Sequence, residues 1–293
     1  IFNKLIKDYP IEKVYTNHDY EPYALARDLE VKTLLESAGV EFITFKDQVI
    51  FEQNEVVKDD GKPYVVYTPY SRKWVAKFEE EGIENYPSES LLDNLYQEKK
   101  LPEITTTEMG FSQASLVPKA YQFDDQLIDQ YEATRNFPAT DSTSRLGVHL
   151  RFGTQSIRDL VTKSASRKNP TFLKELIWRE FFMQILWHFP HTKERSFKKQ
   201  YDRIQWRNDE TEFKKWCEGE TGYPLVDAGM RELNKTGFMH NRVRMLVASF
   251  LCKHLLIDWR WGEAYFAEKL FDYEMASNVG NWQWAAGSGV DAA

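Results

Sequence analysis

Residues 11–45 read IEKVYTNHDYEPYALARDLEVKTLLESAGVEFITF, and this stretch decides the fold class of the first part of the chain. The runs 11–16 and 40–45 are rich in residues that favour β-strands. Residues 24–38 lie between them, carry leucines at near-helical spacing and end at Gly39, a residue typical of helix C-termini. A strand, a helix and a second strand predict a βαβ unit with two parallel strands.

The remainder of the chain divides into an irregular stretch, a linker and a helical part. Residues 46–73 show little regular pattern apart from a hairpin signal at Asp60-Gly61. Prolines and a run of three threonines mark residues 82–120 as a linker. After residue 121 the pattern is helical, so the fold class is α/β plus all-α. The predicted helices are 121–133, 154–165, 170–188, 222–235, 240–255, 261–270 and 276–286.

The charge of the chain is distributed unevenly. The 293 residues carry 38 basic and 45 acidic side chains, which gives a net charge of −7. Residues 151–207 nevertheless hold 13 basic and 5 acidic side chains, a net charge of +8. A basic surface attracts phosphate even on an acidic protein, although a solvated helix face explains such a run equally well.

The composition excludes several classes of protein. Two cysteines, Cys217 and Cys252, argue against a disulfide scaffold or a zinc ribbon and favour a reducing cytoplasm. No apolar run approaches the ~20 residues of a transmembrane helix. The first residues do not resemble a secretion signal. We therefore expect a cytoplasmic protein with no membrane partner and no metal site.

Two segments of the helical part offer groups that suit phosphate or substrate binding. Residues 143–153 combine hydroxyls with a glycine, which can present backbone N–H groups to a phosphate or simply cap a helix. Glu175 and Trp178 share one helical face and could line a cavity. The plain alternative is a surface ion pair between Glu175 and Arg179.

Two further segments combine polar groups with aromatic rings. Residues 236–245 place an amide and two guanidinium groups directly after a glycine turn, groups that suit base edges and phosphates. His240 in this segment is more consistent with a structural hydrogen bond than with a catalytic base. Residues 272–284 hold Trp282 and Trp284, which are two positions apart and must point in different directions on a helix.

Four longer motifs identify a family. They are WREFF at 178–182, TGYPLVDAGMRELNKTGFMHNRVRM at 221–245, LLIDWRWGE at 255–263 and NWQWAAGSGVDAA at 281–293. With these motifs the chain closely resembles the photolyase/cryptochrome family of flavoproteins, in particular the class I photolyases that repair cyclobutane pyrimidine dimers. The resemblance extends from about residue 10 to the end of the chain and is densest after residue 131.

The resemblance implies a domain organisation. It gives a partial Rossmann-like α/β domain of the antenna type at 1–81, an interdomain linker at 82–120 and a helical FAD- and DNA-binding domain at 121–293. Family members have additional strands before Ile1 and additional helices at the other end, so we expect both domains to be incomplete. The folate-binding pair of one subgroup aligns near Tyr23-Ala24 and does not match. A second antenna chromophore therefore stays open, with its identity unknown.

The resemblance also implies an FAD site in the helical domain. The implied FAD-binding residues are Tyr131, Thr143, Ser144, Arg145, Leu146, Gly147, Arg179, Arg244, Asp272, Glu274 and Asn278. Arg244 would pair with Asp272 beside the flavin ring, and Asn278 would face flavin N5. Two positions depart from the family pattern, because Gly147 stands where Ser is usual and Glu274 where Asp is usual.

UV-damaged DNA is the implied partner, with the dimer flipped out of the duplex into a pocket. The implied pocket residues are Glu175, Trp178, Asn241, Met245 and Trp284, and the implied DNA-binding residues are Arg135, Glu175, Trp178, Arg179, Asn241 and Arg242. Trp178 and Trp284 would form apolar walls. In such surroundings burial would raise the pKa of Glu175, so that its carboxyl group could share a proton with a thymine carbonyl.

The implied reaction is light-driven DNA repair by a carbon–carbon lyase. Excited reduced FAD gives one electron to the dimer, the cyclobutane bonds split and the electron returns. Trp206, Trp259 and Trp282 match the electron-transfer chain of the family, and packing alone is the alternative reading. We expect a monomer without an obligate protein partner. The rival functions are a cryptochrome-type photoreceptor without repair and a non-catalytic fragment.

Overall fold

The computed structural model describes the chain except residues 85, 97–104 and 292–293, so part of the expected linker lies outside the described residues. Strands β1 (Lys13–Asn17) and β2 (Glu41–Phe45) pair in parallel, with Lys13 opposite Glu41. Helix α2 (Pro22–Ser37) connects them and begins at a proline, which suits a first helical turn. The predicted βαβ unit is therefore confirmed, and a short helix α1 (Phe2–Asp8) precedes it.

The end of the stretch 46–73 is not irregular, as the sequence suggested, but helical. Helix α3 (Tyr67–Glu81) buries Tyr67, Tyr70 and Trp74, which lie three and four residues apart on one face. The hairpin signal before it corresponds to a tight turn, in which Gly61 has a φ of +77° and its N–H donates to the carbonyl of Lys58. A short helix η1 (Ser88–Asn94) follows in the linker.

The second half of the chain is helical over the residues that the structure describes. Its helices are α4 (Asp125–Thr134), α5 (Gly147–Arg151), α6 (Ile157–Ala165), α7 (Thr171–His188), η2 (Pro190–Lys193), η3 (Lys199–Arg203), α8 (Glu210–Glu218), α9 (Pro224–Thr236), α10 (Asn241–Lys253), α11 (Trp259–Lys269) and α12 (Met275–Ala286). The seven helices expected here are all present within four residues of their predicted bounds. Helix α8 was not predicted, although the Asp209 side chain caps it and Gly219 ends it in the left-handed conformation.

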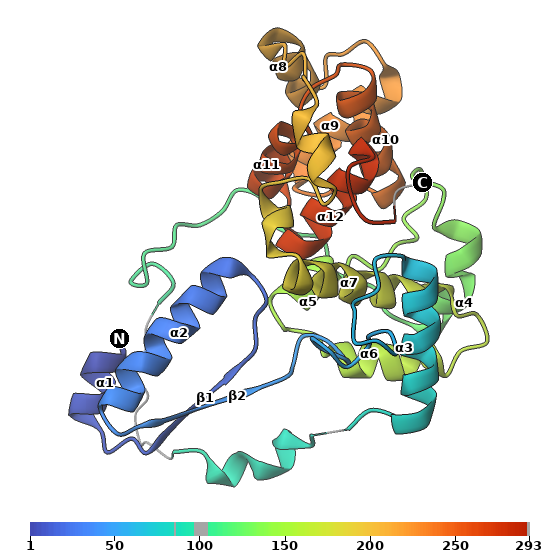
Figure 1. The fold of residues 1–293 in the computed structure, drawn as a ribbon. Coiled ribbons are helices and arrows are strands. Elements are labelled where there is room, and N and C mark those ends of the chain that lie inside the picture. Colours follow the sequence, from blue (N-terminus) through green and yellow to red (C-terminus); the bar gives the residue numbers. More distant parts are fainter. Residues whose placement is uncertain (85, 97–104, 292–293) are drawn as a thin grey trace.

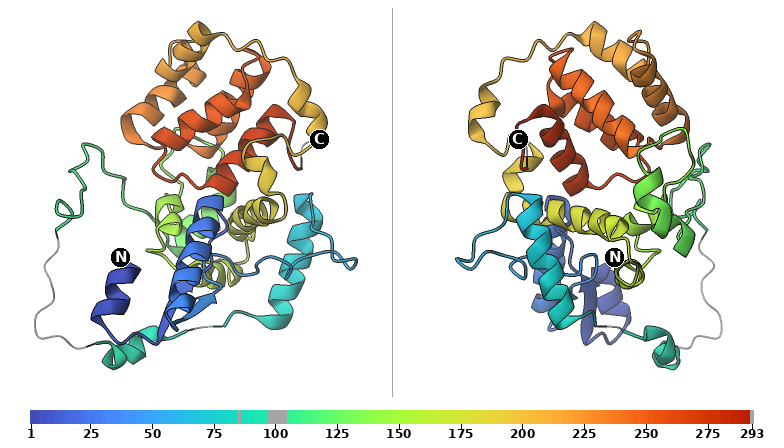
Figure 2. Two further views of the ribbon diagram at one scale, coloured as in Figure 1. Left: turned by 60° about the vertical axis from the view of Figure 1, so that its left-hand side comes forward. Right: turned by 90° about the vertical axis from the view of Figure 1, so that its right-hand side faces the viewer.

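Two hydrophobic cores hold these helices together. The first joins α3, α4, α6 and α7 with the loop that contains Val49, Ile50 and Phe51. The second joins α8 to α12 around the fully buried Trp216 and Trp259. Figures 1 and 2 show the βαβ unit at one side of the molecule and α3 alongside α7. Helix α7 belongs to the first core and also packs on α12, so it links the two.

Helix α7 also binds the segment 48–53 through a row of side chains. Arg179 donates to the carbonyl of residue 48 at 2.7 Å, and the Glu180 carboxylate accepts the N–H groups of residues 50 and 51 at 2.7 and 3.1 Å. Gln184 donates to the carbonyl of residue 51 at 3.1 Å, and the His188 ring contacts that of residue 53 at 2.9 Å. The polar backbone of this loop is thus satisfied by one helix. Among the described residues no helix is long and apolar enough to cross a bilayer.

Candidate functional site

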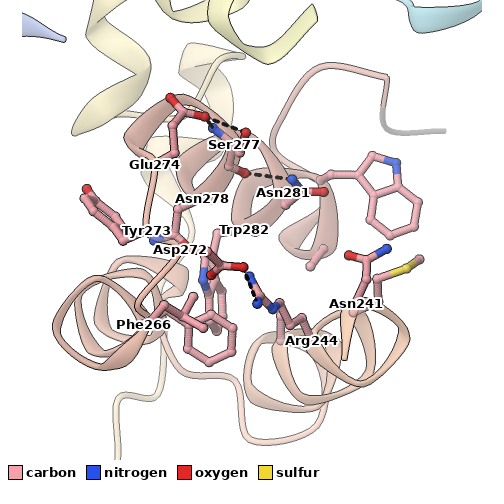
Figure 3. A pocket seen from close by; sticks show the side chains of 15 residues that line it. Asn241, Arg244, Phe266, Asp272, Tyr273, Glu274, Ser277, Asn278, Asn281 and Trp282 are labelled. Atoms are coloured by element: carbon pink, nitrogen blue, oxygen red, sulfur yellow. Dashed lines mark hydrogen bonds and ion pairs between the residues drawn. The ribbon is translucent and has the colours of Figure 1, made fainter. Parts of the chain in front are cut away.

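Two adjoining cavities lie between α7, α10 and α12. The first, of about 90 Å³, is lined by residues of α10, α11, α12 and the turn before α12 (Figure 3). The second, of about 340 Å³, lies between α7 and the N-terminal end of α10. The two adjoin, because they share the lining residues Asn241, Met245, Ser277, Asn281 and Trp284. We call them the inner cavity and the outer cavity.

A glycine turn aims the polar side chains of α10 at both cavities. Gly237 ends α9 with a φ of +66°, and a Cβ atom at this position would lie 2.4 Å from the ring of Phe271. His240 then caps α10, since its Nδ1 accepts the N–H of Arg242. Burial and the neighbouring guanidinium groups lower the pKa of His240, so this ring is neutral and serves as a cap. Asn241 is the next residue along the chain and lines both cavities.

An ion pair forms one wall of the inner cavity. The Arg244 guanidinium lies 2.9 Å from Asp272 Oδ2, which is the pair expected from the sequence (Figure 3). Arg244 also donates to the carbonyl of Met239, which fixes its orientation. Asp272 Oδ1 is buried and has no donor among the described residues. A buried acceptor without a donor is costly, so this oxygen is suited to a ligand that offers one.

The first turn of α12 supplies two more polar groups. Glu274 caps the helix, because its carboxylate accepts the N–H groups of Ala276 and Ser277, each at 3.0 Å. Asn278 lines the cavity, and its Nδ2 donates to the carbonyl and to Oε1 of Glu263 on α11. Burial raises the pKa of Glu263. Glu263 was not among the predicted site residues, although it holds the Asn278 amide in one orientation.

The outer cavity contains a carboxylate that is paired with a guanidinium group beside apolar walls. Glu175 on α7 contacts the guanidinium of Arg135, which follows α4. Glu175 is therefore paired with a positive charge, which the sequence did not predict, while Trp178 and Trp284 still supply apolar walls. Arg242 faces the same cavity and donates to Asn136 Oδ1 at 2.7 Å, and it has no carboxylate partner among the described residues. The end of α4 thus contacts both walls of the outer cavity.

Two tryptophans line the outer cavity, and a third lines only the inner one. Trp178 lines the outer cavity and stacks on Tyr67 of α3, with 3.6 Å between ring centroids and 6° between planes. Trp284 is 38% exposed and lines both cavities, whereas Trp282 is 2% exposed and packs edge-to-face on Phe266. The two residues of the pair do point in different directions, as their spacing predicted. Tyr67 was not predicted to belong to the site.

The stretch 143–147 does not line the inner cavity, and it approaches the cavity wall at Gly147. Gly147 lies so close to Asp272 that a Cβ atom on it would be 2.8 Å from the Asp272 Cβ. Leu146 is buried, and Arg145 stacks over Phe238 while it pairs with Asp141, so Arg145 lines a separate cavity of about 270 Å³. Thr143 and Ser144 line neither the inner nor the outer cavity.

The other predicted residues lie around this centre. Tyr131 packs edge-to-face on Phe172, and Arg179 lines the outer cavity while bonded to the segment 48–53. Trp259 and Trp282 are buried in the second core, and Trp206 is partly buried at its edge. Among the described residues the indole in ring contact with Trp282 is that of Trp216, at 6.1 Å between centroids. These positions place three tryptophans in one core without fixing a path between them.

Comparisons with known proteins agree on one family. A family model described as DNA photolyase matches residues 1–89, and one described as the FAD binding domain of DNA photolyase matches residues 172–293. The deoxyribodipyrimidine photo-lyase of Agrobacterium fabrum is 38% identical over 312 residues, which is 100% of this chain and 65% of that protein.

Solved structures of the same family have the same fold. A bacterial class III photolyase from Agrobacterium tumefaciens matches with a TM-score of 0.85 and 36% identity over 100% of this chain. A cryptochrome from Synechocystis matches with a TM-score of 0.81 and 27% identity over 99% of this chain. The chain spans 65% of the length of each of these structures.

Proposed function

Because the chain belongs to the photolyase/cryptochrome family of flavoproteins, we propose that it carries the FAD and lesion sites of a DNA photolyase. The reaction would be the light-driven splitting of cyclobutane pyrimidine dimers in UV-damaged DNA. One observation carries the proposal. The inner cavity, with its Arg244–Asp272 pair, adjoins the outer cavity that holds Glu175 and Trp178 and shares five lining residues with it.

The residues of the inner cavity fit a flavin. Asp272 Oδ1 lacks a donor among the described residues, and a flavin offers a ring N–H and ribityl hydroxyl groups. The Asn278 amide, held by Glu263, is oriented for one further polar contact. Arg244 supplies a positive charge that is paired and therefore tolerable when buried. When bound in its reduced form and excited by blue light, FAD would supply the electron that opens the dimer and would take it back afterwards.

The residues of the outer cavity fit a flipped pair of pyrimidines. Flipping costs a few kcal/mol, and least for a damaged base, which favours lesions over intact bases. Trp178 and Trp284 provide apolar surface for rings that no longer stack in the duplex. A carboxylate paired with a guanidinium accepts hydrogen bonds and has no proton to donate. We therefore assign Glu175 the role of accepting the ring N–H of a thymine, in place of the proton donation expected from the sequence.

The remaining site residues would bind the DNA strand and relay electrons. Arg242 has no carboxylate partner among the described residues, so its charge is available to a flanking phosphate. Trp206, Trp259 and Trp282 would pass an electron toward the inner cavity to keep the flavin reduced. The division at residues 81 and 121 into antenna-type and helical domains is proposed with the function. An antenna chromophore is proposed only as a class, without a chemical identity.

Light and a damaged oligonucleotide test this function directly. The protein is expressed, its visible spectrum is recorded, and a dimer-containing oligonucleotide is added under blue light. Flavin absorbance together with restored thymines is the expected result, and a parallel sample kept in the dark should show no repair. Flavin without repair would favour a cryptochrome-type photoreceptor. Absence of both would refute the proposal.

A further inference from the structure

Tyr67 lies behind Trp178 and has no assigned role in the site. It is the first residue of α3, lies more than 100 positions from Trp178 in sequence and is 9% exposed. Its ring stacks on the indole of Trp178 with 3.6 Å between centroids and 6° between planes. Trp178 lines the outer cavity and Tyr67 does not, so the phenol covers the side of the indole that faces away from it.

The stack is held in place through both the hydroxyl group and the backbone of Tyr67. The Tyr67 hydroxyl donates to the carbonyl of Lys174 at 2.8 Å, one turn before Trp178 on the same helix. Burial raises the pKa of this hydroxyl, which keeps it neutral and able to donate. The Tyr67 N–H donates to Asp291 Oδ1 at 3.0 Å, and Asp291 itself lines the outer cavity. The ring is thus anchored to α7 and to the C-terminal segment at once.

Nearly face-to-face stacking is not the arrangement that aromatic pairs prefer in isolation. Here the surroundings enforce it, since Phe181 contacts both rings edge-on, at 5.9 Å from Tyr67 and 5.6 Å from Trp178. Phe182 lies at 5.5 Å from Trp178 and also lines the outer cavity. The indole therefore has one orientation before any ligand arrives.

We propose that Tyr67 is a positioning residue that fixes the plane of Trp178 as a preformed wall for the flipped pyrimidine dimer. The inference rests on the proposed function. A wall that is already ordered spares the lesion the entropic cost of ordering one large side chain, which corresponds to about a 2- to 10-fold gain in affinity. Undamaged DNA does not enter the cavity, so the ordered indole of Trp178 does not raise its affinity.

Three variants test the inference by binding in the dark, without reference to repair. Tyr67→Leu removes the flat face, Tyr67→Phe keeps the stack and loses only the hydroxyl, and Phe78→Leu removes a comparable ring from α3. Phe78 stacks on Trp74, at 5.4 Å between centroids. The measurement is the ratio of dissociation constants for an undamaged and a dimer-containing oligonucleotide, by fluorescence anisotropy at equal flavin content.

We expect Tyr67→Leu to lower this ratio about 2- to 10-fold by weakening binding of the dimer-containing oligonucleotide alone. Tyr67→Phe keeps the ring and loses one anchor, so it should lose less than Tyr67→Leu, and Phe78→Leu should retain the wild-type ratio. An unchanged ratio in Tyr67→Leu, with a wild type that discriminates, would overturn the positioning role. An equal loss in Phe78→Leu would overturn it too. A wild type that does not discriminate would instead refute the proposed function. If Tyr67→Leu does not fold, Tyr67→Met takes its place with the same expected result.

Discussion

Replacing Glu180 with Gln should remove a pH dependence from the stability of the protein. The Glu180 carboxyl group is 3% exposed and lies between α7, α3 and the loop before α3. Besides the two backbone N–H groups of the loop, it accepts the indole N–H of Trp74 at 2.5 Å and the hydroxyl of Tyr70 at 3.3 Å. Burial outweighs these four donors and raises the pKa of Glu180 to about 7.

The sign of the effect follows from this raised pKa. Between the ordinary pKa of 4.5 and about 7, the folded protein binds a proton at Glu180 that the unfolded chain has released. This contribution to stability is therefore complete below pH 4.5 and is lost as the pH rises toward 7. At about 1.4 kcal/mol for each pH unit, the loss amounts to about 3 kcal/mol.

Urea unfolding of the wild type and of Glu180→Gln, at equal flavin content and at several pH values from about 5 to 8, measures this loss. The substituted glutamine cannot ionise, and its amide N–H₂ meets donors, so the variant should be less stable by about 1–3 kcal/mol at low pH. The deficit of the variant should then shrink as the pH rises and, because the wild type loses about 3 kcal/mol, should vanish or change sign near pH 7. Parallel curves would refute the reasoning. Trp74→Phe, which removes one donor, should instead move the decline to higher pH.

Three other substitutions test separate parts of the site. Gly147→Ser should weaken flavin binding about tenfold or more, measured by equilibrium titration, because the new Cβ would lie 2.8 Å from the Asp272 Cβ and overpack the cavity wall. Unchanged affinity would show that Asp272 can move freely. Arg242→Gln should reduce the slope of log affinity against log salt by about 0.9 for damaged DNA, and an unchanged slope would exclude a phosphate contact. Trp282→Phe should slow light-driven reduction of the flavin far more than repair by pre-reduced protein, and equal losses in both assays would contradict a relay role.

Local signals were sufficient to predict most of the helices. Helices α7, α9 and α12 combine apolar periodicity with recognisable ends, such as the proline that opens α9 and the glycine that ends it. Helix α3 was not predicted, because its buried face consists of Tyr67, Tyr70 and Trp74, and Pro69 interrupts the pattern. Those aromatic residues are buried because α7 packs against them, and this contact between distant segments cannot be predicted from the sequence of α3.

The positions of site residues that belong to a family motif were predictable. Contacts between side chains on different helices were not. The Arg244–Asp272 pair and the positions of Asn278 and Trp284 followed from motifs near the end of the chain. The support of Asn278 by Glu263 did not, because this contact depends on how α11 and α12 pack. The pairing of Glu175 with Arg135 likewise joins residues 40 positions apart. Under the proposed function, this pairing assigns the carboxyl group the acceptance of a hydrogen bond in place of the shared proton expected from the sequence.

The side chains on α7 that bind segment 48–53 show that the boundary between packed units does not coincide with the exposed linker. The exposed residues 105–120 are where a protease would cut the backbone. The hydrophobic cores do not follow this cut. The loop before α3 and α3 itself pack in the same core as α7, on the other side of the linker. A chain nicked in this stretch would therefore stay assembled as two complementary pieces. Excision of the helical part alone would leave an apolar face of α7 open to water.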